Sequence, residues 1–179
     1  MTVPAPEDKE RKVSFERERG VYAIQVMRDV AQAVVSVGDD GTRSDHILHV
    51  FSVLAESDIP VFLIKLHSSV ITLACSGADT VRTEQTLAGA GLRASTRRDL
   101  AVIVVCATLL QDVSGIMVTI ADALSSVGVP LLETSDAHNS VQCLVETRHV
   151  SAAVEALCRA FHLDKDGVCE RRLEAEEAA

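Results

Sequence analysis

The residues best suited to binding chemistry follow a continuous apolar stretch at residues 101–107. They are Asp112, in the loop after that stretch, and Gly115 and Ile116, at the start of a helical pattern. A loop at the start of a helix presents backbone N–H groups, and these suit the carboxylate of an amino acid. Gly115 has no side chain, so a carboxylate can approach the backbone closely there. The sequence therefore predicts an anion-binding turn at this point.

A second group of polar residues lies between two strand-like runs at residues 135–139. A carboxylate and an amide there can hold an ammonium group. With the anion-binding turn, this group predicts an amino-acid site formed by Asp112, Gly115, Ile116, Ser135, Asp136, His138 and Asn139. The alternative is a purely structural turn, because Asp-Ala-His-Asn is also favourable turn chemistry.

An internal repeat with a period of seventy residues organises the chain. At this spacing Pro60 and Pro130 each follow a β-branched residue, and Arg28-Asp29 aligns with Arg98-Asp99 without a gap. The apolar phase is preserved throughout, so we infer a duplication. Each copy has the pattern strand, helix, strand, strand, helix.

The first copy offers a weaker version of the same site, because Asp45 stands where the second copy has Gly115. A ligand carboxylate would meet a like charge there. The polar positions that keep a second site open are Asp39, Asp45, His67 and Ser68. A cation bound by the loop carboxylates is an alternative, and solvated carboxylates are the plainer interpretation.

Other chemical groups give weaker signals. His46 and His49 have helical spacing, and we expect surface histidines rather than metal ligands. Lys65 ends an apolar strand, where an edge residue is expected rather than a nucleophile. The five cysteines include no CxxC pair, which favours reduced core thiols over disulfides or zinc. The pattern predicts no catalytic residues, no metal and no cofactor.

Periodicity predicts the elements of both copies. In the second copy we expect strands at 101–107, 129–134 and 141–145, and helices from an N-cap at Ser114 to 127 and at 150–161. In the first copy we expect strands at 32–37, 61–66 and 70–75, and helices at 45–56 and 80–90.

Each copy lacks one strand of a ferredoxin-like βαββαβ unit. Residues 92–97 can complete the first copy, and residues 20–27, which precede that copy, can complete the second. We therefore predict an α+β fold with two ferredoxin-like domains in tandem, the first inserted in the second. The predicted parts are a flexible N-terminal tail at 1–19, domain 1 at 29–98, domain 2 at 20–28 plus 99–163, and an acidic C-terminal tail at 164–179.

Composition restricts the partners. The chain has 179 residues, is 47% hydrophobic, and carries a formal net charge of −9 with only 3% aromatic residues. This argues against nucleic acid and against an anionic membrane surface as partners. No apolar run approaches the roughly 20 residues of a spanning helix, and the polar N-terminus does not resemble a signal peptide. We expect a cytoplasmic protein.

The pattern resembles the tandem ACT regulatory region of an aspartokinase. The matching motifs are Ser-Gly-Ile at 114–116 and the segments at 120–129, 131–141 and 152–161. Residues 135–139 are most similar to the diaminopimelate-regulated bacterial subtype. The resemblance covers about residues 20–163 and identifies both predicted domains as ACT domains.

The resemblance implies a non-catalytic, amino-acid-sensing regulatory protein in feedback control of aspartate-family biosynthesis. Lysine, diaminopimelate and threonine are the implied effectors. Residues 1–19 contain no glycine-rich phosphate loop, so we expect a regulatory subunit without its kinase domain, with an aspartokinase catalytic chain as a partner. A homodimer is also expected, because the strands at 102–107 and 61–64 are apolar on both faces.

Two other functions stay open. One is a ligand-free ACT module that only dimerises or docks a partner, and the other is an enzyme with an unrecognised site. Thermal stabilisation by amino acids would separate the sensor from the docking module, and turnover of any substrate would favour the enzyme.

Overall fold

The computed structural model describes residues 20–38, 43–108, 113–137 and 139–171. The strands of this part are β1 (Val21–Ser36), β2 (Val61–Leu66), β3 (Val70–Ser76), β4 (Ala94–Ala107), β5 (Glu133–Ala137), β6 (Ser140–Glu146) and β7 (Val168–Arg171). The α-helices are α1 (Arg43–Glu56), α2 (Thr80–Gly89), α3 (Val113–Ser126) and α4 (Val150–Ala160). Single-turn helices lie at η1 (Gly77–Asp79), η2 (Thr147–His149) and η3 (Lys165–Gly167). No helix in this part of the chain is long and apolar enough to cross a membrane.

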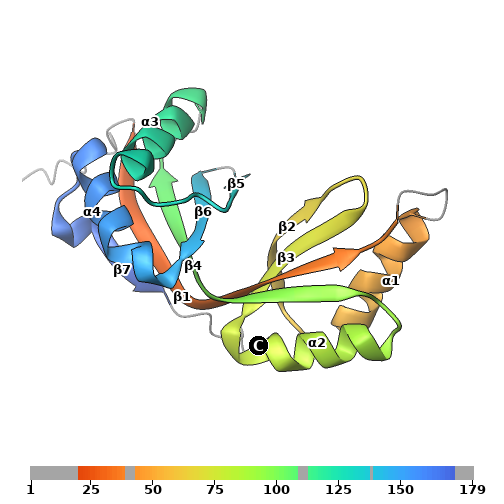
Figure 1. Ribbon diagram of the computed structural model, residues 1–179. Coiled ribbons are helices and arrows are strands. Elements are labelled where there is room, and N and C mark those ends of the chain that lie inside the picture. The colour runs from red at the N-terminus through yellow and green to blue at the C-terminus, as the bar shows by residue number, and fades with distance from the viewer. Residues whose placement is uncertain (1–19, 39–42, 109–112, 138, 172–179) are drawn as a thin grey trace, which may run out of the picture.

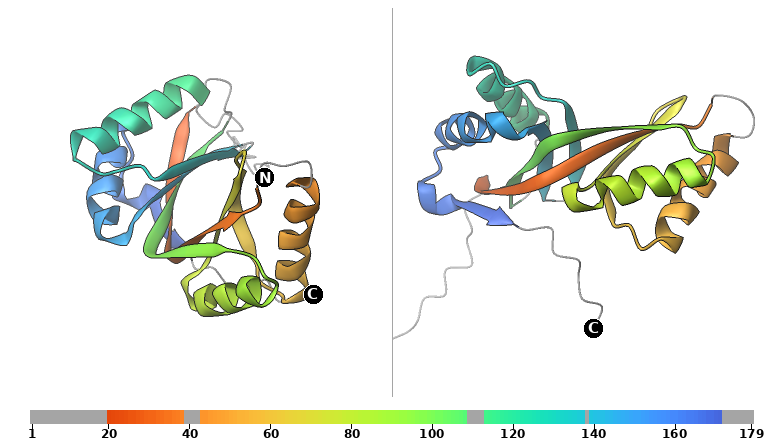
Figure 2. Two further views of the ribbon diagram at one scale, coloured as in Figure 1. Left: turned by 45° about the vertical axis from the view of Figure 1, so that its right-hand side comes forward. Right: turned by 60° about the horizontal axis from the view of Figure 1, so that its bottom comes forward.

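Two long antiparallel strands, β1 and β4, run through the whole molecule (Figures 1 and 2). The sheet order is β2-β3-β1-β4-β6-β5, and β7 pairs with β1. The first lobe, as we define it, contains α1, β2, β3 and α2, together with the C-terminal part of β1 and the N-terminal part of β4. The second lobe consists of α3, β5, β6, α4 and the remaining parts of β1 and β4.

Each lobe has the strand arrangement of a ferredoxin-like unit. The N-terminal part of β1 pairs with the end of β4 in the second lobe, from Val21 opposite Ala107 to Met27 opposite Val102. This confirms the predicted α+β fold, in which the first strand of the chain completes the second copy. The residue limits given above for the two domains stay a prediction.

The duplication extends to individual hydrogen bonds. In the first lobe the Val37 N–H donates to the carbonyl of Ser69 at 2.9 Å. Seventy residues later the Ala107 N–H donates to the carbonyl of Asn139, also at 2.9 Å. In each lobe this bond joins the end of one central strand to the turn of a β-hairpin, so the two copies place these turns alike.

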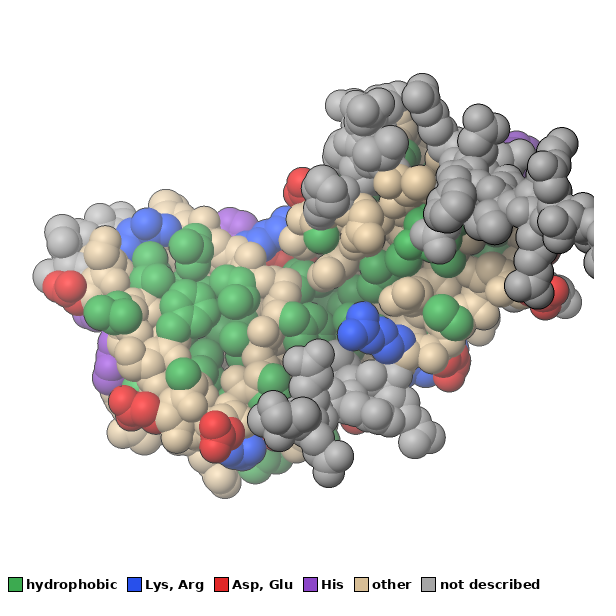
Figure 3. Space-filling model, turned by 180° about the vertical axis from the view of Figure 1, so that it is seen from behind, with side chains coloured by type: hydrophobic (Ala, Val, Ile, Leu, Met, Phe, Trp, Pro, Cys, Tyr) green, Lys and Arg blue, Asp and Glu red, His purple; other side chains and the backbone are tan. Residues whose placement is uncertain are grey.

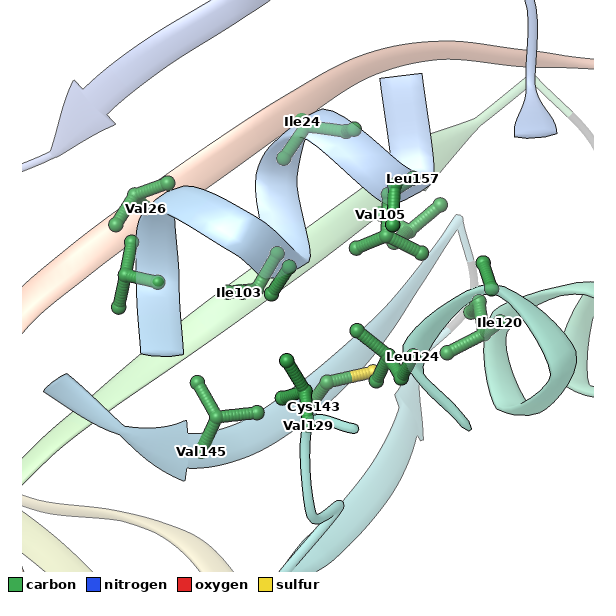
Figure 4. Close-up of a cluster of buried hydrophobic side chains, with 14 of the residues drawn as sticks. Ile24, Val26, Ile103, Val105, Ile120, Leu124, Val129, Cys143, Val145 and Leu157 are labelled. Carbon is green, nitrogen blue, oxygen red and sulfur yellow. The ribbon is translucent and has the colours of Figure 1, made fainter. Parts of the chain in front are cut away.

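The second lobe has a core between its sheet and helices α3 and α4 (Figure 4). The alternate residues of β4 that face the helices pack with the apolar stripe of α3, which includes Ile120 and Leu124. The corresponding core of the first lobe packs Val50 and Leu54 of α1 and Leu87 of α2 against β1 and β3. A helical spacing of three to four and a strand spacing of two place these residues on the inner faces.

In each lobe the helices leave one face of the sheet uncovered, and these two faces, here called the open faces, meet where the lobes join. Val102, Val104 and Cys106 of the second lobe are buried in one cluster with Leu63 and Ala74 of the first lobe. The expectation that this face of β4 needs a partner molecule is therefore wrong, because the chain itself covers it. A homodimer has to be argued from other residues.

Three local predictions differ from the structure. The strand expected at 129–134 is β5 at Glu133–Ala137, so Ser135 and Asp136 lie in a strand rather than a turn. Ser114 lies inside α3 rather than at its N-cap. The C-terminal segment expected as a solvated tail contains η3 and β7.

Strand β7 forms because the outer edge of β1 is open at this point. Val168 lies opposite Ile24 in a parallel pairing, and its side chain packs against the core of the second lobe. Arg28 and Glu170 form an exposed ion pair at 2.9 Å alongside it. The apolar side chain of Val168 and the open backbone edge of β1 thus hold this otherwise polar segment as a strand.

Candidate ligand-binding site

The turn between β5 and β6 lies beside the end of β4, where the Ala107 N–H donates to the Asn139 carbonyl. Beyond β4 the chain leads to α3, whose first turn carries the other predicted residues. Two of the predicted residues, Asp112 and His138, lie outside the described residues. Asn139 is exposed at the turn.

Gly115 is the third residue of α3, and Ile116 is half-buried against the core of the second lobe. The first turn of a helix presents N–H groups and a partial positive charge, which favour an anion. The Thr119 hydroxyl donates to the Gly115 carbonyl at 2.9 Å, which satisfies an acceptor within the helix. The first turn of α3 is therefore suited to a carboxylate.

Strand pairing separates two residues that the sequence placed together. Asp136 lies opposite Val141, whose side chain belongs to the helix-covered core, whereas Ser135 lies opposite Gln142. Successive residues of a strand point to opposite faces. Asp136 is therefore on the same side of the sheet as α3, with Gly115 and Ile116, and Ser135 is on the open face.

In the first lobe, Asp45 is the third residue of α1, as Gly115 is in α3. Its exposed carboxylate stands in the first turn, where the helix dipole stabilises a negative charge. A ligand carboxylate would therefore compete with it. His67 and Ser68 are exposed at the β2–β3 turn, and Asp39 lies outside the described residues.

Arg43 is a candidate that the sequence analysis missed. Its Nη2 donates to the His67 carbonyl at 2.7 Å, which ties the start of α1 to the β2–β3 turn. Its Nε is buried and has no hydrogen-bond partner among the residues that the structure describes. The sequence did offer a signal for this residue, because Arg43 stands two residues before Asp45 and partly offsets the negative charge at the start of that helix.

One histidine is held by the backbone, and three of the five cysteines are buried. His46 donates from Nδ1 to the Val37 carbonyl at 2.7 Å, and no group of three metal-ligating side chains comes together among the described residues. All five cysteines are free. Burial raises the pKa of the Cys143 thiol to about 12, so this side chain is an inert core group rather than a nucleophile.

A family model described as an ACT domain matches residues 95–159. Aspartokinase 1 of Bacillus subtilis (strain 168) is 27% identical over 150 residues, which is 83% of this chain and 36% of that protein. The chain thus spans about a third of the length of this curated relative.

Two solved structures show the same fold. The ligand-free regulatory subunit of aspartate kinase from Thermus thermophilus has a TM-score of 0.71 at 20% identity, and the match covers 81% of this chain and 100% of that one. Aspartokinase III of E. coli, in complex with lysine and aspartate, has a TM-score of 0.65 at 16% identity and is covered over 34% of its length. The match to that enzyme covers 82% of this chain. Residues 95–159 thus match the ACT-domain family, and in its α+β fold the chain is similar to the regulatory part of aspartokinases.

Proposed function

We propose that this chain is a non-catalytic regulatory protein that senses an amino acid and controls aspartate-family biosynthesis. The observation that carries the proposal is the match to a regulatory subunit of aspartate kinase over that subunit's whole length. A chain built like a regulatory subunit needs a ligand site and a means of acting on an enzyme. An aspartokinase catalytic chain is the partner that this resemblance supports.

The effector site that we propose lies at the start of α3. The first turn, with Gly115, receives the α-carboxylate, and Asp136 on the same side of the sheet attracts the ammonium group. Ile116 and Asn139 border the site. Lysine, diaminopimelate and threonine are the candidate effectors; lysine is bound by the E. coli relative, and the motif at 135–139 favours the diaminopimelate-regulated subtype.

The first lobe is a second candidate, with Asp45, His67 and Ser68. We place the main site in the second lobe because Gly115 adds neither a Cβ nor a charge where the ligand carboxylate must approach. Asp45 adds both at the equivalent position of α1.

A thermal-shift screen across the free amino acids tests this function. A ligand at about 100 times its dissociation constant stabilises the folded state by roughly 2.7 kcal/mol. At about 2–4 °C per kcal/mol for a chain of this size, the midpoint should rise by roughly 5–10 °C. If no amino acid shifts the midpoint at millimolar concentration, the chain is a ligand-free docking module instead.

Two substitutions locate the site in the same assay. Gly115→Asp should abolish the shift by a steric clash and by charge repulsion, whereas Asp45→Gly should keep it or add a second site. A shift that survives Gly115→Asp and disappears when His67 and Ser68 are both changed to alanine would move the site to the first lobe.

The proposed assembly is a homodimer in the cytoplasm. Strand β2 is an edge strand, and Ile64 and Leu66 on it are 42% and 53% exposed. Hydrophobic side chains gather on the surface of the first lobe that faces away from the viewer in Figure 1 (Figure 3). An exposed apolar edge of this kind favours pairing with a second copy. The five free thiols suit a reducing compartment.

A further inference from the structure

A cavity of about 460 Å³ lies between the lobes, on the open faces of their sheets. It is separate from the effector site proposed above, which is on the helix side of the second sheet. The first lobe lines it with four polar residues, and the second lobe with the segment 131–134, which leads into β5. The polar residues of the first lobe are Gln32, Lys65, His67 and Thr72.

Glu133 holds the two walls of this cavity together. Gln32 of β1 donates from Nε2 to Glu133 Oε2 at 2.6 Å, and the Thr72 hydroxyl of β3 donates to Oε1 at 2.7 Å. Thr72 is only 8% exposed, so its hydroxyl is fixed beside the carboxylate. Each carboxylate oxygen still has a second lone pair, which leaves Glu133 able to accept from a cationic ligand group.

Lys65 supplies a positive charge to the same cavity. It lies opposite Thr72 in the β2–β3 pairing, on the open face, and is half-buried. Its ammonium group makes no hydrogen bond or ion pair to any other residue in the described part of the chain. An anionic ligand group would give this cation a charge-assisted hydrogen-bond partner.

We propose that this cavity binds a small α-amino acid, with its carboxylate on Lys65 and its ammonium group on Glu133. The opposite charges stand on opposite walls, as a zwitterion requires, and the volume suits a molecule of amino-acid size. Leu131 and Leu132 give the cavity an apolar part for an aliphatic side chain. The bound molecule would bridge the lobes and reinforce the contact that Glu133 already makes.

Ligand-induced thermal shifts of the full chain test the proposal, with glycine, alanine, aspartate, lysine and propionate as probes at 10 millimolar and below. We expect Lys65→Met to weaken the binding of whichever amino acid stabilises the parent chain, with a dissociation constant about ten-fold higher or more. Hydrogen bonds to charged groups contribute about 1.5–3 kcal/mol. Lys65→Arg should retain binding. The matched control Arg93→Met removes an exposed cation that does not line the cavity and should change nothing.

Glu133→Gln should weaken the binding of the amino acid but not the binding of propionate, which lacks an ammonium group. For each variant, the melting midpoint with ligand is compared with the midpoint of the same variant without ligand. This separates a loss of binding from a loss of basal stability. NMR of methylated lysines provides a direct readout, because the chain has only Lys9, Lys12, Lys65 and Lys165. The Lys65 signal should move on titration.

The outcomes separate this site from the effector site at α3. A shift lost in Lys65→Met and kept in Gly115→Asp places the amino acid in the cavity. Because His67 also lines the cavity, a shift lost in the His67 and Ser68 double variant but kept in Lys65→Met places it at the first-lobe candidate instead and overturns the cavity proposal. A shift lost only in Gly115→Asp overturns the cavity proposal and leaves the proposed function standing. Absence of any shift with all five probes, with an unmoved Lys65 signal, also overturns the cavity proposal.

Discussion

Asp29 and Asp99, seventy residues apart, share the same positive φ of 58°. Both lie at register shifts in the pairing of β1 with β4, between Met27 opposite Val102 and Gln32 opposite Arg97. Left-handed backbone is uncommon for residues other than glycine, and aspartate is among those that tolerate it. The duplicated Arg-Asp pair thus places an equivalent kink in each long strand where it passes from one lobe to the other.

Asp99→Val is expected to lower the free energy of unfolding by roughly 1–3 kcal/mol, because a β-branched residue is strained at this φ. Asp99→Gly should cost much less. Urea denaturation of both variants measures the difference. Arg98→Val, at the preceding exposed position, is the control; equal stability of Asp99→Val and Asp99→Gly would show that the kink stores no strain.

A close approach at Gly77 gives a second prediction. A Cβ at Gly77 would lie 2.0 Å from Oδ1 and 2.7 Å from Cγ of Asp29. Gly77→Ala should therefore destabilise the chain by about 1–3 kcal/mol, and adding Asp29→Gly should restore most of the loss. Gly89→Ala meets nothing within 4 Å and should be neutral or stabilising.

The repeat made much of this fold predictable. Apolar periodicity located β2, β3 and the four α-helices, and the missing strand in each copy indicated where residues 20–27 belong. The continuity of β1 and β4 was not predictable, because Arg28-Asp29 and Arg98-Asp99 look like polar breaks. The packing of the apolar face of β4 against the first lobe was also not predicted. A sequence pattern shows that such a face must be buried, but it does not show whether another molecule or the other lobe buries it.

The candidate site was predictable only in part. The glycine at the start of α3 follows from the pattern of strand, loop and helix. The separation of Ser135 from Asp136 does not, because it depends on the register of β5, and turn-forming residues concealed that strand. The role of Glu133 was not predictable, because its partners Gln32 and Thr72 are distant in sequence.

Buried thiols give the chain a pH dependence on the alkaline side. The pKa of Cys143 is about 12 in the folded chain, against an ordinary value of 9.0. Above pH 9 the unfolded chain therefore loses this proton first, so the free energy of unfolding falls between pH 9 and 12 and is unaffected at lower pH. The slope from one such group approaches about 1.4 kcal/mol per pH unit.

Cys143→Ala isolates this contribution. The variant should be less stable than the parent at pH 7.5, because it leaves a cavity. The difference in the free energy of unfolding between the parent and the variant should be smaller by about 1–2 kcal/mol at pH 10.5 than at pH 7.5, as measured by urea titration. A gap that stays constant between the two pH values would contradict the assignment to Cys143.

The proposed homodimer is tested by charging its edge. Ile64→Lys combined with Leu66→Lys should convert a dimer into a folded monomer in sedimentation equilibrium at micromolar concentration. Val118→Lys, on α3 and 60% exposed in the parent, should leave the dimer intact. A parent chain that is monomeric with and without amino acids would disprove the dimer.

Isothermal titration calorimetry of the full chain with lysine, diaminopimelate and threonine tests the sensor function most directly. The account predicts saturable binding of at least one of the three with a dissociation constant below millimolar, and its loss in Gly115→Asp while circular dichroism shows the variant folded. Absence of binding by all three, with the parent chain folded and at millimolar ligand, would contradict it.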